Sequence, residues 1–247
     1  MRPQPDDIEA PPFAPKLPWI NSGALRMHQQ RGRPVLVEIW DFARVNSLRT
    51  LPYVKGWHER YEERGLRVVG VQCGAWPFSR DAGEVRAAVE RLGVPYPVVV
   101  DENFETWDLY GNAGWPARYL WNPENRLDYF HYGEGAYAET EEAIQLLLGI
   151  EGEPTLLPVR GEDEPGALLP AQTEDQAGEY SGPYEAGGVW AVLEGRGEAR
   201  ANRRTVEVSY SGCHALIEHD RHTRGELELE VGDGVVCHAV CFTPGLE

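Results

Sequence analysis

Hydrophobic positions in the first third of the chain change from the spacing of a strand to that of a helix. Residues 35–39 are apolar except for Glu38, which is typical of a strand covered on both faces of a sheet. Apolar residues then recur from Leu48 to Tyr61 at the spacing of one helical face. The pattern predicts a buried strand that leads directly into a helix, with the short segment 41–47 between them.

Strands and helices continue to alternate up to residue 149. The pattern predicts strands over 66–73 and 96–101, helices over 81–92 and 105–110, a hairpin over 115–132 and a last helix over 139–149. Asp81 can cap the first of these helices, and Gly93 can end it. The order β-α-β-α-β-α-β-β-α predicts an α/β fold.

The pattern from Gly188 to the end is that of strands alone. Leu227, Leu229 and Val231 alternate with glutamates, as in an antiparallel sheet with one solvated face. About six short strands fit into this region, which predicts a small all-β module of the sandwich or jelly-roll kind.

Two stretches interrupt these patterns. Residues 1–17 contain five prolines and predict an extended arm or a disordered tail. Residues 151–187 are rich in Glu, Asp, Pro and Gly and predict a linker, part of which packs on one of the domains. The sequence therefore predicts a Pro-rich arm over 1–17, a first domain over 18–150, an acidic linker over 151–187 and a β-module over 188–247.

The segment from Val35 to Pro52 resembles the thioredoxin-like redoxins. It keeps Val35-Leu-Val-Glu-Ile-Trp40 and Leu48-Arg-Thr-Leu-Pro52. It is most similar to the TlpA-type domain of DipZ-like proteins, which reads V-L-V-(D/E)-F-W before a C-x-x-C pair. The two cysteine positions of that pair fall on Arg44 and Ser47. The resemblance implies a thioredoxin-like fold for residues 18–150.

The resemblance also implies which residues surround the site. Glu38 stands where these proteins keep a buried acid, and Trp115-Pro116 matches their cis X-Pro bond. Disulfide exchange needs a thiolate nucleophile and a resolving thiol, and Arg44 and Ser47 supply neither. Without the thiols, Glu38 is expected to be a paired structural carboxylate. The resemblance therefore predicts a redoxin fold with a degenerate exchange site.

Two interpretations of Arg44 remain open. In one, Arg44 is a solvated side chain that points away, because a cation opposes the dipole at a helix start. In the other, Arg44, the Ser47 hydroxyl and the free N–H groups of the first helical turn hold an anion. The resemblance places both residues in a ligand groove with Phe42, Trp115 and Pro116. A peptide or a small organic anion is the ligand expected there.

Four cysteines are spread over the chain. Cys73 ends a predicted strand, and a buried thiol is favoured there over a displaced nucleophile, because no basic residue follows until Arg80. Cys213, Cys237 and Cys241 lie within predicted strands, so core packing is favoured over a soft-metal site. Cys237 and Cys241 are expected to share one face of their strand. No metal or other cofactor is predicted.

Net charge and hydropathy limit the classes of partner and the cellular location that the sequence predicts. The net charge of −17 argues against nucleic-acid binding. No apolar run is long enough to span a membrane, and the N-terminus lacks the apolar segment of a signal peptide, which favours the cytoplasm. The oligomeric state is left open by the sequence.

Two functions are compatible with these observations. The first is a redox-inactive redoxin that acts as a binding or scaffold module. The alternative is an active redoxin, either a thiol-disulfide oxidoreductase or a peroxiredoxin-like antioxidant, that uses Cys73 or a C-terminal cysteine. Turnover with disulfide and peroxide substrates distinguishes them.

Overall fold

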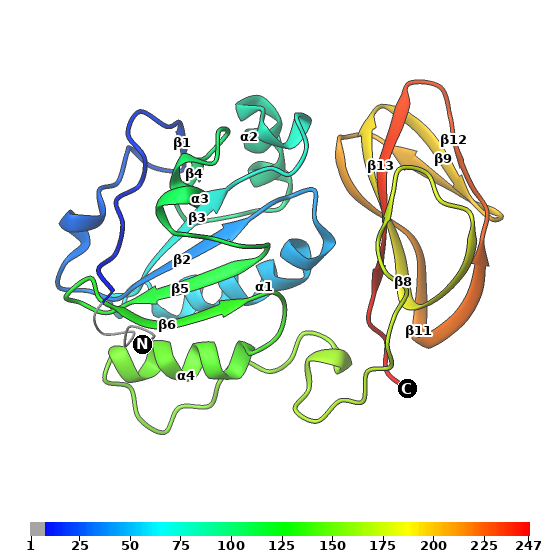
Figure 1. The fold of residues 1–247 in the computed structure, drawn as a ribbon. Coiled ribbons are helices and arrows are strands. Elements are labelled where there is room, and N and C mark those ends of the chain that lie inside the picture. Colours follow the sequence, from blue (N-terminus) through cyan, green and yellow to red (C-terminus); the bar gives the residue numbers. More distant parts are fainter. Residues whose placement is uncertain (1–7) are drawn as a thin grey trace. The chain divides into compact units, whose positions relative to one another are not determined.

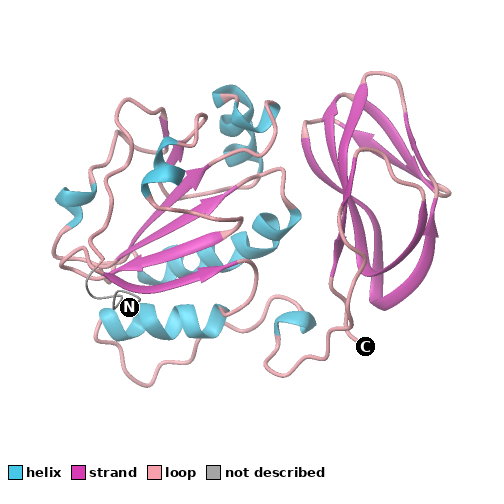
Figure 2. Ribbon diagram, viewed as in Figure 1, coloured by secondary structure: helices cyan, strands magenta, loops and turns pink. Residues whose placement is uncertain are grey.

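The computed structural model describes residues 8–247, and the chain forms two compact units. The second unit comprises Pro158–Glu247 together with the short segment Ala43–Val45, the first unit comprises the other described residues, and we describe each unit by itself. No helix of the described residues is long and apolar enough to cross a membrane. The first unit mixes helices and strands, whereas the second is built almost entirely from strands (Figure 1, Figure 2).

The first unit is built around a six-stranded sheet with the strand order β1-β4-β3-β2-β5-β6. Strands β2, β3 and β4 run parallel to one another, while β5 and β6 form the predicted antiparallel hairpin. The strands are β1 (Trp19–Ile20), β2 (Val35–Trp40), β3 (Arg67–Gln72), β4 (Val98–Val100), β5 (Ala117–Trp121) and β6 (Leu127–Tyr132). The helices are α1 (Val45–Tyr61), α2 (Ala82–Arg91), α3 (Glu105–Leu109) and α4 (Tyr137–Leu147), with short 3-10 helices η2 (Met27–Gln30) and η3 (Phe78–Arg80). From β2 onward the strands and α-helices follow the predicted order, whereas β1 and the 3-10 helices were not predicted.

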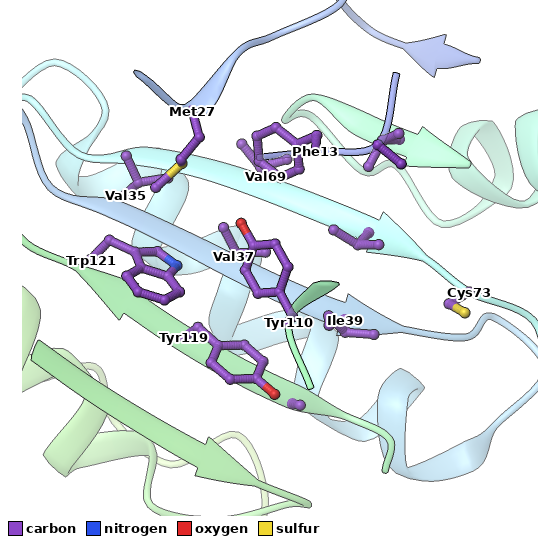
Figure 3. Packing of buried hydrophobic residues seen from close by; sticks show 14 of the residues in the cluster. Phe13, Met27, Val35, Val37, Ile39, Val69, Cys73, Tyr110, Tyr119 and Trp121 are labelled. Atoms are coloured by element: carbon purple, nitrogen blue, oxygen red, sulfur yellow. The ribbon is translucent and has the colours of Figure 1, made fainter. Parts of the chain in front are cut away.

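Side chains that alternate along β2 give the sheet two different faces. Val35, Val37 and Ile39 point into a hydrophobic core, which Figure 3 shows from close by. Glu38 points to the opposite face, because successive residues of a strand alternate, and it is fully buried there. One face of the sheet is therefore apolar, whereas the other carries a buried ionisable group.

Residues 8–17 are part of the folded first unit. The Ala10 N–H donates a hydrogen bond of 2.9 Å to a carbonyl in the turn between β5 and β6. Phe13 and Leu17 are buried and belong to the core of Figure 3. Residues 8–17 thus differ from the disordered tail that composition gave as one alternative, because burial of these apolar side chains offsets the cost of ordering the segment. Residues 1–7 of the predicted arm lie outside the described residues.

Residues 151–187, the predicted linker, have contacts with the folded units. Glu153 forms an ion pair of 2.7 Å with Arg64, and the Leu156 N–H donates to the buried carboxylate of Glu141 on α4 (2.7 Å). Further along, β7 (Gln176–Ala177) pairs with β13 of the second unit. The acidic stretch is therefore divided between the two units, and each part packs on its own unit.

The second unit contains two antiparallel sheets that share one hydrophobic core. Their strand orders are β10-β9-β12 and β11-β8-β13-β7. The strands are β8 (Gly182–Gly195), β9 (Gly197–Ala201), β10 (Arg204–Val208), β11 (Gly212–Leu227), β12 (Leu229–Val231) and β13 (Val235–Thr243). Ala199 from one sheet and Leu193 from the other lie in the common core. The module is sandwich-like, but β8 begins before Gly188, and β8 and β11 are long strands of 14 and 16 residues.

A β-bulge in β13 decides which face its cysteines occupy. Cys237 pairs with Leu193 on β8, whereas Cys241 pairs with Trp190. Leu193 and Trp190 are an odd number of positions apart, so the two cysteines point to opposite faces. The register shift between Cys237 and Ala239 supplies the extra residue. The prediction that the two cysteines share a face was wrong, because it assumed an unbroken period of two.

The N-terminus of α2 gives a test of local energetics. The Asp81 carboxylate accepts hydrogen bonds from the N–H groups of Gly83 (2.9 Å) and Glu84 (3.0 Å). An Asp81→Ala variant should lose about 1 kcal/mol of unfolding free energy, because these N–H groups lose their acceptor. Urea unfolding measures the loss, and Asp81→Asn, which keeps an acceptor, should lose less than half as much. Equal losses in both variants would show that the side-chain acceptor does not stabilise the helix.

Candidate functional site

The turn between β2 and α1 carries Arg44, and Ser47 follows in the first turn of α1. The Ser47 hydroxyl accepts a hydrogen bond from the Asp41 N–H (3.2 Å), and both residues are fully buried. The Asp41 carboxylate accepts from the Ala75 N–H (2.8 Å) and from the Ser79 hydroxyl (3.4 Å). Ser47 therefore closes the turn from the inside. Its hydroxyl is directed away from solvent, which differs from the predicted surface role in anion binding.

Arg44 and Phe42 belong to the same turn but have different surroundings. Arg44 directly precedes α1 and is half-buried, and the first turn of that helix carries no acidic side chain. Phe42 is buried, and its ring centre lies 6.2 Å from that of Phe78 on η3. Phe42 therefore packs on η3, whereas Arg44 keeps part of its surface exposed.

The Trp115–Pro116 peptide bond is cis and lies at the same end of the sheet as this turn. The register places Ile39 on β2 opposite Ala117 on β5, so the residues before β5 adjoin the end of β2. The Trp115 indole N–H donates to the Cys73 carbonyl (2.7 Å). The structure thus places the loop before β5 beside the β2–α1 turn, as the resemblance implies.

Trp115 belongs to a group of three partly exposed aromatic side chains. Its ring centre lies 4.4 Å from that of Trp107 and 6.3 Å from that of Phe104. All three residues are half-buried, so each keeps part of its ring accessible. Such a cluster offers apolar contact area at little cost in side-chain entropy.

Glu38 lies on β2 immediately before this turn and is fully buried. The register places Arg118 on β5 directly opposite Glu38, and the Tyr96 hydroxyl donates to the Glu38 carboxylate (3.2 Å). Burial raises the pKa of Glu38 to about 7, although Arg118 and the Tyr96 hydrogen bond act in the opposite direction. Tyr96 is thus the hydrogen-bond partner of the Glu38 carboxylate, and Arg118 on the neighbouring strand is the cation that acts on it by charge.

Arg118 is a site residue that sequence reasoning missed. Its guanidinium donates to the Gly135 carbonyl and lies over the rings of Trp57 (5.7 Å) and Tyr137 (5.1 Å). Burial lowers the pKa of Arg118, while Tyr137 and Glu38 raise it. Its Nε and Nη1 atoms and the Glu38 Oε1 atom are buried without a hydrogen-bond partner in the described structure. The available signal was an arginine inside the otherwise apolar strand β5.

Cys73 is fully buried among apolar side chains (Figure 3). Burial raises the pKa of its thiol far above the ordinary value, and the nearby carboxylates of Asp101 and Asp41 raise it further. The thiol therefore stays protonated at neutral pH, and a protonated thiol is a poor nucleophile. These surroundings favour the predicted packing role over the role of a displaced nucleophile.

The three cysteines of the second unit are also buried, and none of them forms a disulfide with another described residue. Cys213 and Cys241 lie on strands at opposite sides of β8. Two strand spacings, about 9.5 Å, separate such positions, which exceeds the reach of a disulfide. Burial raises the pKa of Cys237 to about 11. From residue 8 onward, no group of three or more His, Cys, Asp or Glu side chains is arranged to hold a metal.

Comparison with known proteins finds relatives of the first unit. No protein-family model matches the chain. Protein DipZ of Mycobacterium bovis is 34% identical over 133 residues, which are 53% of this chain and 19% of DipZ. The chain therefore spans only about a fifth of the length of that relative. The thiol-disulfide oxidoreductase YkuV of Bacillus subtilis is 22% identical over 130 residues, which are 53% of this chain and 87% of YkuV.

Similar solved structures also have the thioredoxin-like fold. The solution structure of a thioredoxin-like protein in the oxidized form matches with a TM-score of 0.51 and 23% identity, over 57% of this chain and 96% of that protein. The crystal structure of a thioredoxin-like superfamily protein matches with a TM-score of 0.51 and 21% identity, over 59% of this chain and 99% of that protein. The predicted fold of the first unit is confirmed, and strands make up most of the remainder.

Proposed function

We propose that this protein, whose first unit has a thioredoxin-like fold, is a redox-inactive binding or scaffold module. The β2–α1 turn carries the proposal, because the resemblance places Arg44 and Ser47 at the two cysteine positions of the exchange pair. Neither side chain can form a mixed disulfide or resolve one. Ser47 instead closes the turn through the Asp41 N–H, which gives the position a structural role.

The proposed ligand of this site is an extended peptide or a small organic anion. The partly exposed Trp115, with Trp107 and Phe104, offers an aromatic surface beside the turn. Arg44 and the N–H groups of the first turn of α1 supply positive charge and hydrogen-bond donors. Because the Ser47 hydroxyl is engaged inside the turn, Arg44 is the side chain that we propose to contact a carboxylate.

An active redoxin is the second candidate, and similarity to YkuV, a thiol-disulfide oxidoreductase, favours it. Such an enzyme requires Cys73 or a cysteine of the second unit as its nucleophile. All four cysteines are buried, and burial raises the pKa of Cys73, Cys237 and Cys241. A thiolate is therefore disfavoured at each of these three positions.

Disulfide reduction tests the proposal directly. We expect the wild-type protein to leave the rate of insulin reduction by dithiothreitol at its uncatalysed value. The double variant Arg44→Cys/Ser47→Cys should show turnover, because it restores a nucleophile and a resolving thiol at the start of α1, above the buried Glu38. The matched control is Arg44→Ala/Ser47→Ala, which should stay inactive.

Wild-type turnover of insulin or of hydrogen peroxide would contradict a redox-inactive role. If that turnover were lost in Cys73→Ala, the buried thiol would be the nucleophile, and the active redoxin would replace our proposal. Turnover that disappears only when Cys213, Cys237 and Cys241 are all replaced by alanine would assign the activity to the second unit.

A further inference from the structure

The segment that precedes β2 encloses a groove on the first unit. The groove has a volume of about 510 Å³, and residues between Pro12 and His28 line it (blue in Figure 1). Its apolar lining includes Phe13, Trp19, Leu25 and Met27. A second hollow of about 410 Å³ shares Pro12, Met27 and His28 with it. The groove is made from residues other than those of the β2–α1 turn, so it is a separate site.

The walls of this groove are anchored to the core of the unit. The Phe13 ring meets Trp19 edge-on at 5.3 Å and stacks on Tyr110 at 6.3 Å. The Met27 carbonyl accepts a hydrogen bond from the Asn125 side-chain amide (3.1 Å). Figure 3 shows Phe13 and Met27 above the sheet, on the same side as Tyr110. The groove is thus preformed, and a ligand has little ordering cost to overcome.

Three cationic or basic side chains border this apolar lining. Lys16, Arg26 and His28 are exposed, and none of the three forms an ion pair with a described residue. The acid of the adjoining hollow, Glu9, pairs with Arg31 at 3.1 Å. Cations are scarce in a chain with 23 Lys and Arg against 40 Asp and Glu. The border of the groove is therefore positively charged, whereas the protein as a whole carries a net negative charge.

We propose that this groove binds an organic anion with an apolar body, of the class of medium-chain carboxylates. The volume lies within the range of about 300–1,000 Å³ that is usual for small-molecule sites. The apolar chain would contact Phe13, Trp19 and Leu25, and the carboxylate would lie between Lys16 and Arg26. The site does not depend on the redox state of the protein or on Arg44.

Calorimetric titration of the full chain with decanoate tests the proposal. We expect saturable binding to the wild-type protein and binding weaker by about tenfold or more in Lys16→Glu/Arg26→Glu, because both cations beside the groove change sign. The matched control is Arg86→Glu/Arg203→Glu, which changes the net charge equally at exposed positions outside the groove and should bind within about twofold of wild type. Absence of saturable binding, or equal weakening in the two double variants, would overturn the proposal.

The chemistry of the ligand is tested with two further probes and one further variant. Acetate lacks the apolar body and decyltrimethylammonium has the opposite charge, so neither should displace decanoate. Leu25→Trp should weaken decanoate binding while it leaves both cations in place, because a larger ring fills the half-buried groove wall. Displacement by decyltrimethylammonium at equal concentration would overturn the anion class, and displacement by acetate would overturn the role of the apolar lining. Thermal unfolding of each variant verifies that it is folded.

Discussion

An Arg118→Met variant should unfold with a free energy about 2 kcal/mol below that of the wild-type protein at about pH 8.5, because Glu38 without its nearby cation takes up a proton at a cost of about 1.4 kcal/mol per pH unit above its pKa of about 7. At this pH the carboxylate of Glu38 is ionised, because its pKa is about 7, and it is fully buried. The substitution removes the cation that lies opposite Glu38 on β5 and leaves the Tyr96 hydroxyl as a donor. Methionine fills much of the space beside the rings of Trp57 and Tyr137, so the loss comes chiefly from the unpaired charge.

Urea unfolding followed by tryptophan fluorescence measures this loss in the first unit, because Trp190 is the one tryptophan beyond Leu157. The loss should shrink at about pH 5.5, where Glu38 is protonated and needs no counter-ion. The double variant Glu38→Gln/Arg118→Met removes both ionisable groups and should recover most of the loss. A loss below about 1 kcal/mol at the higher pH would mean that the pair contributes no more than an exposed ion pair does.

The order of strands and helices in the first unit could be predicted because each element is indicated by the pattern of its own residues. The apolar run of β2, the helical spacing of α1 and the capping carboxylate of Asp81 each occupy only a few consecutive residues. The hairpin of β5 and β6 is joined by a short turn and is equally local. Such signals need no knowledge of which strands are neighbours, and the structure contains all of them.

The surroundings of the site depend on contacts between distant segments. Glu38 meets Arg118 only because β2 and β5 are neighbours in one register, and Tyr96 reaches Glu38 from before β4. Strand order is a property of the whole sheet, and no single segment encodes it. The sequence therefore identified the buried acid but could not name its partners.

Composition misled the prediction where a few side chains anchor a segment. The prolines of residues 1–17 suggested an arm, but Phe13 and Leu17 fix residues 8–17 to the core. The same segment supplies Phe13 and Lys16 to the groove proposed above, so that site also escaped prediction. The amino-acid composition of a segment does not show which single side chains are buried. In the same way, an assumed strand period of two does not reveal the bulge between Cys237 and Ala239.

A Glu38→Gln variant should lack a fall in stability that the wild-type protein shows as the pH rises. The Glu38 carboxyl has a pKa of about 7 in the folded state, against a reference value of 4.5. Between these values the folded state holds a proton that the unfolded state has released. The unfolding free energy therefore falls with rising pH, by about 1.4 kcal/mol per pH unit and about 3 kcal/mol in total. Glutamine does not titrate, so the variant has no such fall.

The quantity to measure is the unfolding free energy of Glu38→Gln minus that of the wild-type protein, from about pH 4.5 to about pH 8.5. Subtraction cancels the groups that both proteins share, such as Asp101, whose pKa burial raises, and His58, whose pKa burial lowers. The difference should increase by about 3 kcal/mol in favour of the variant, with most of the change below pH 7. A flat difference would mean that the carboxyl keeps its ordinary pKa, and hence that Arg118 and Tyr96 fully compensate the burial of an ionised Glu38.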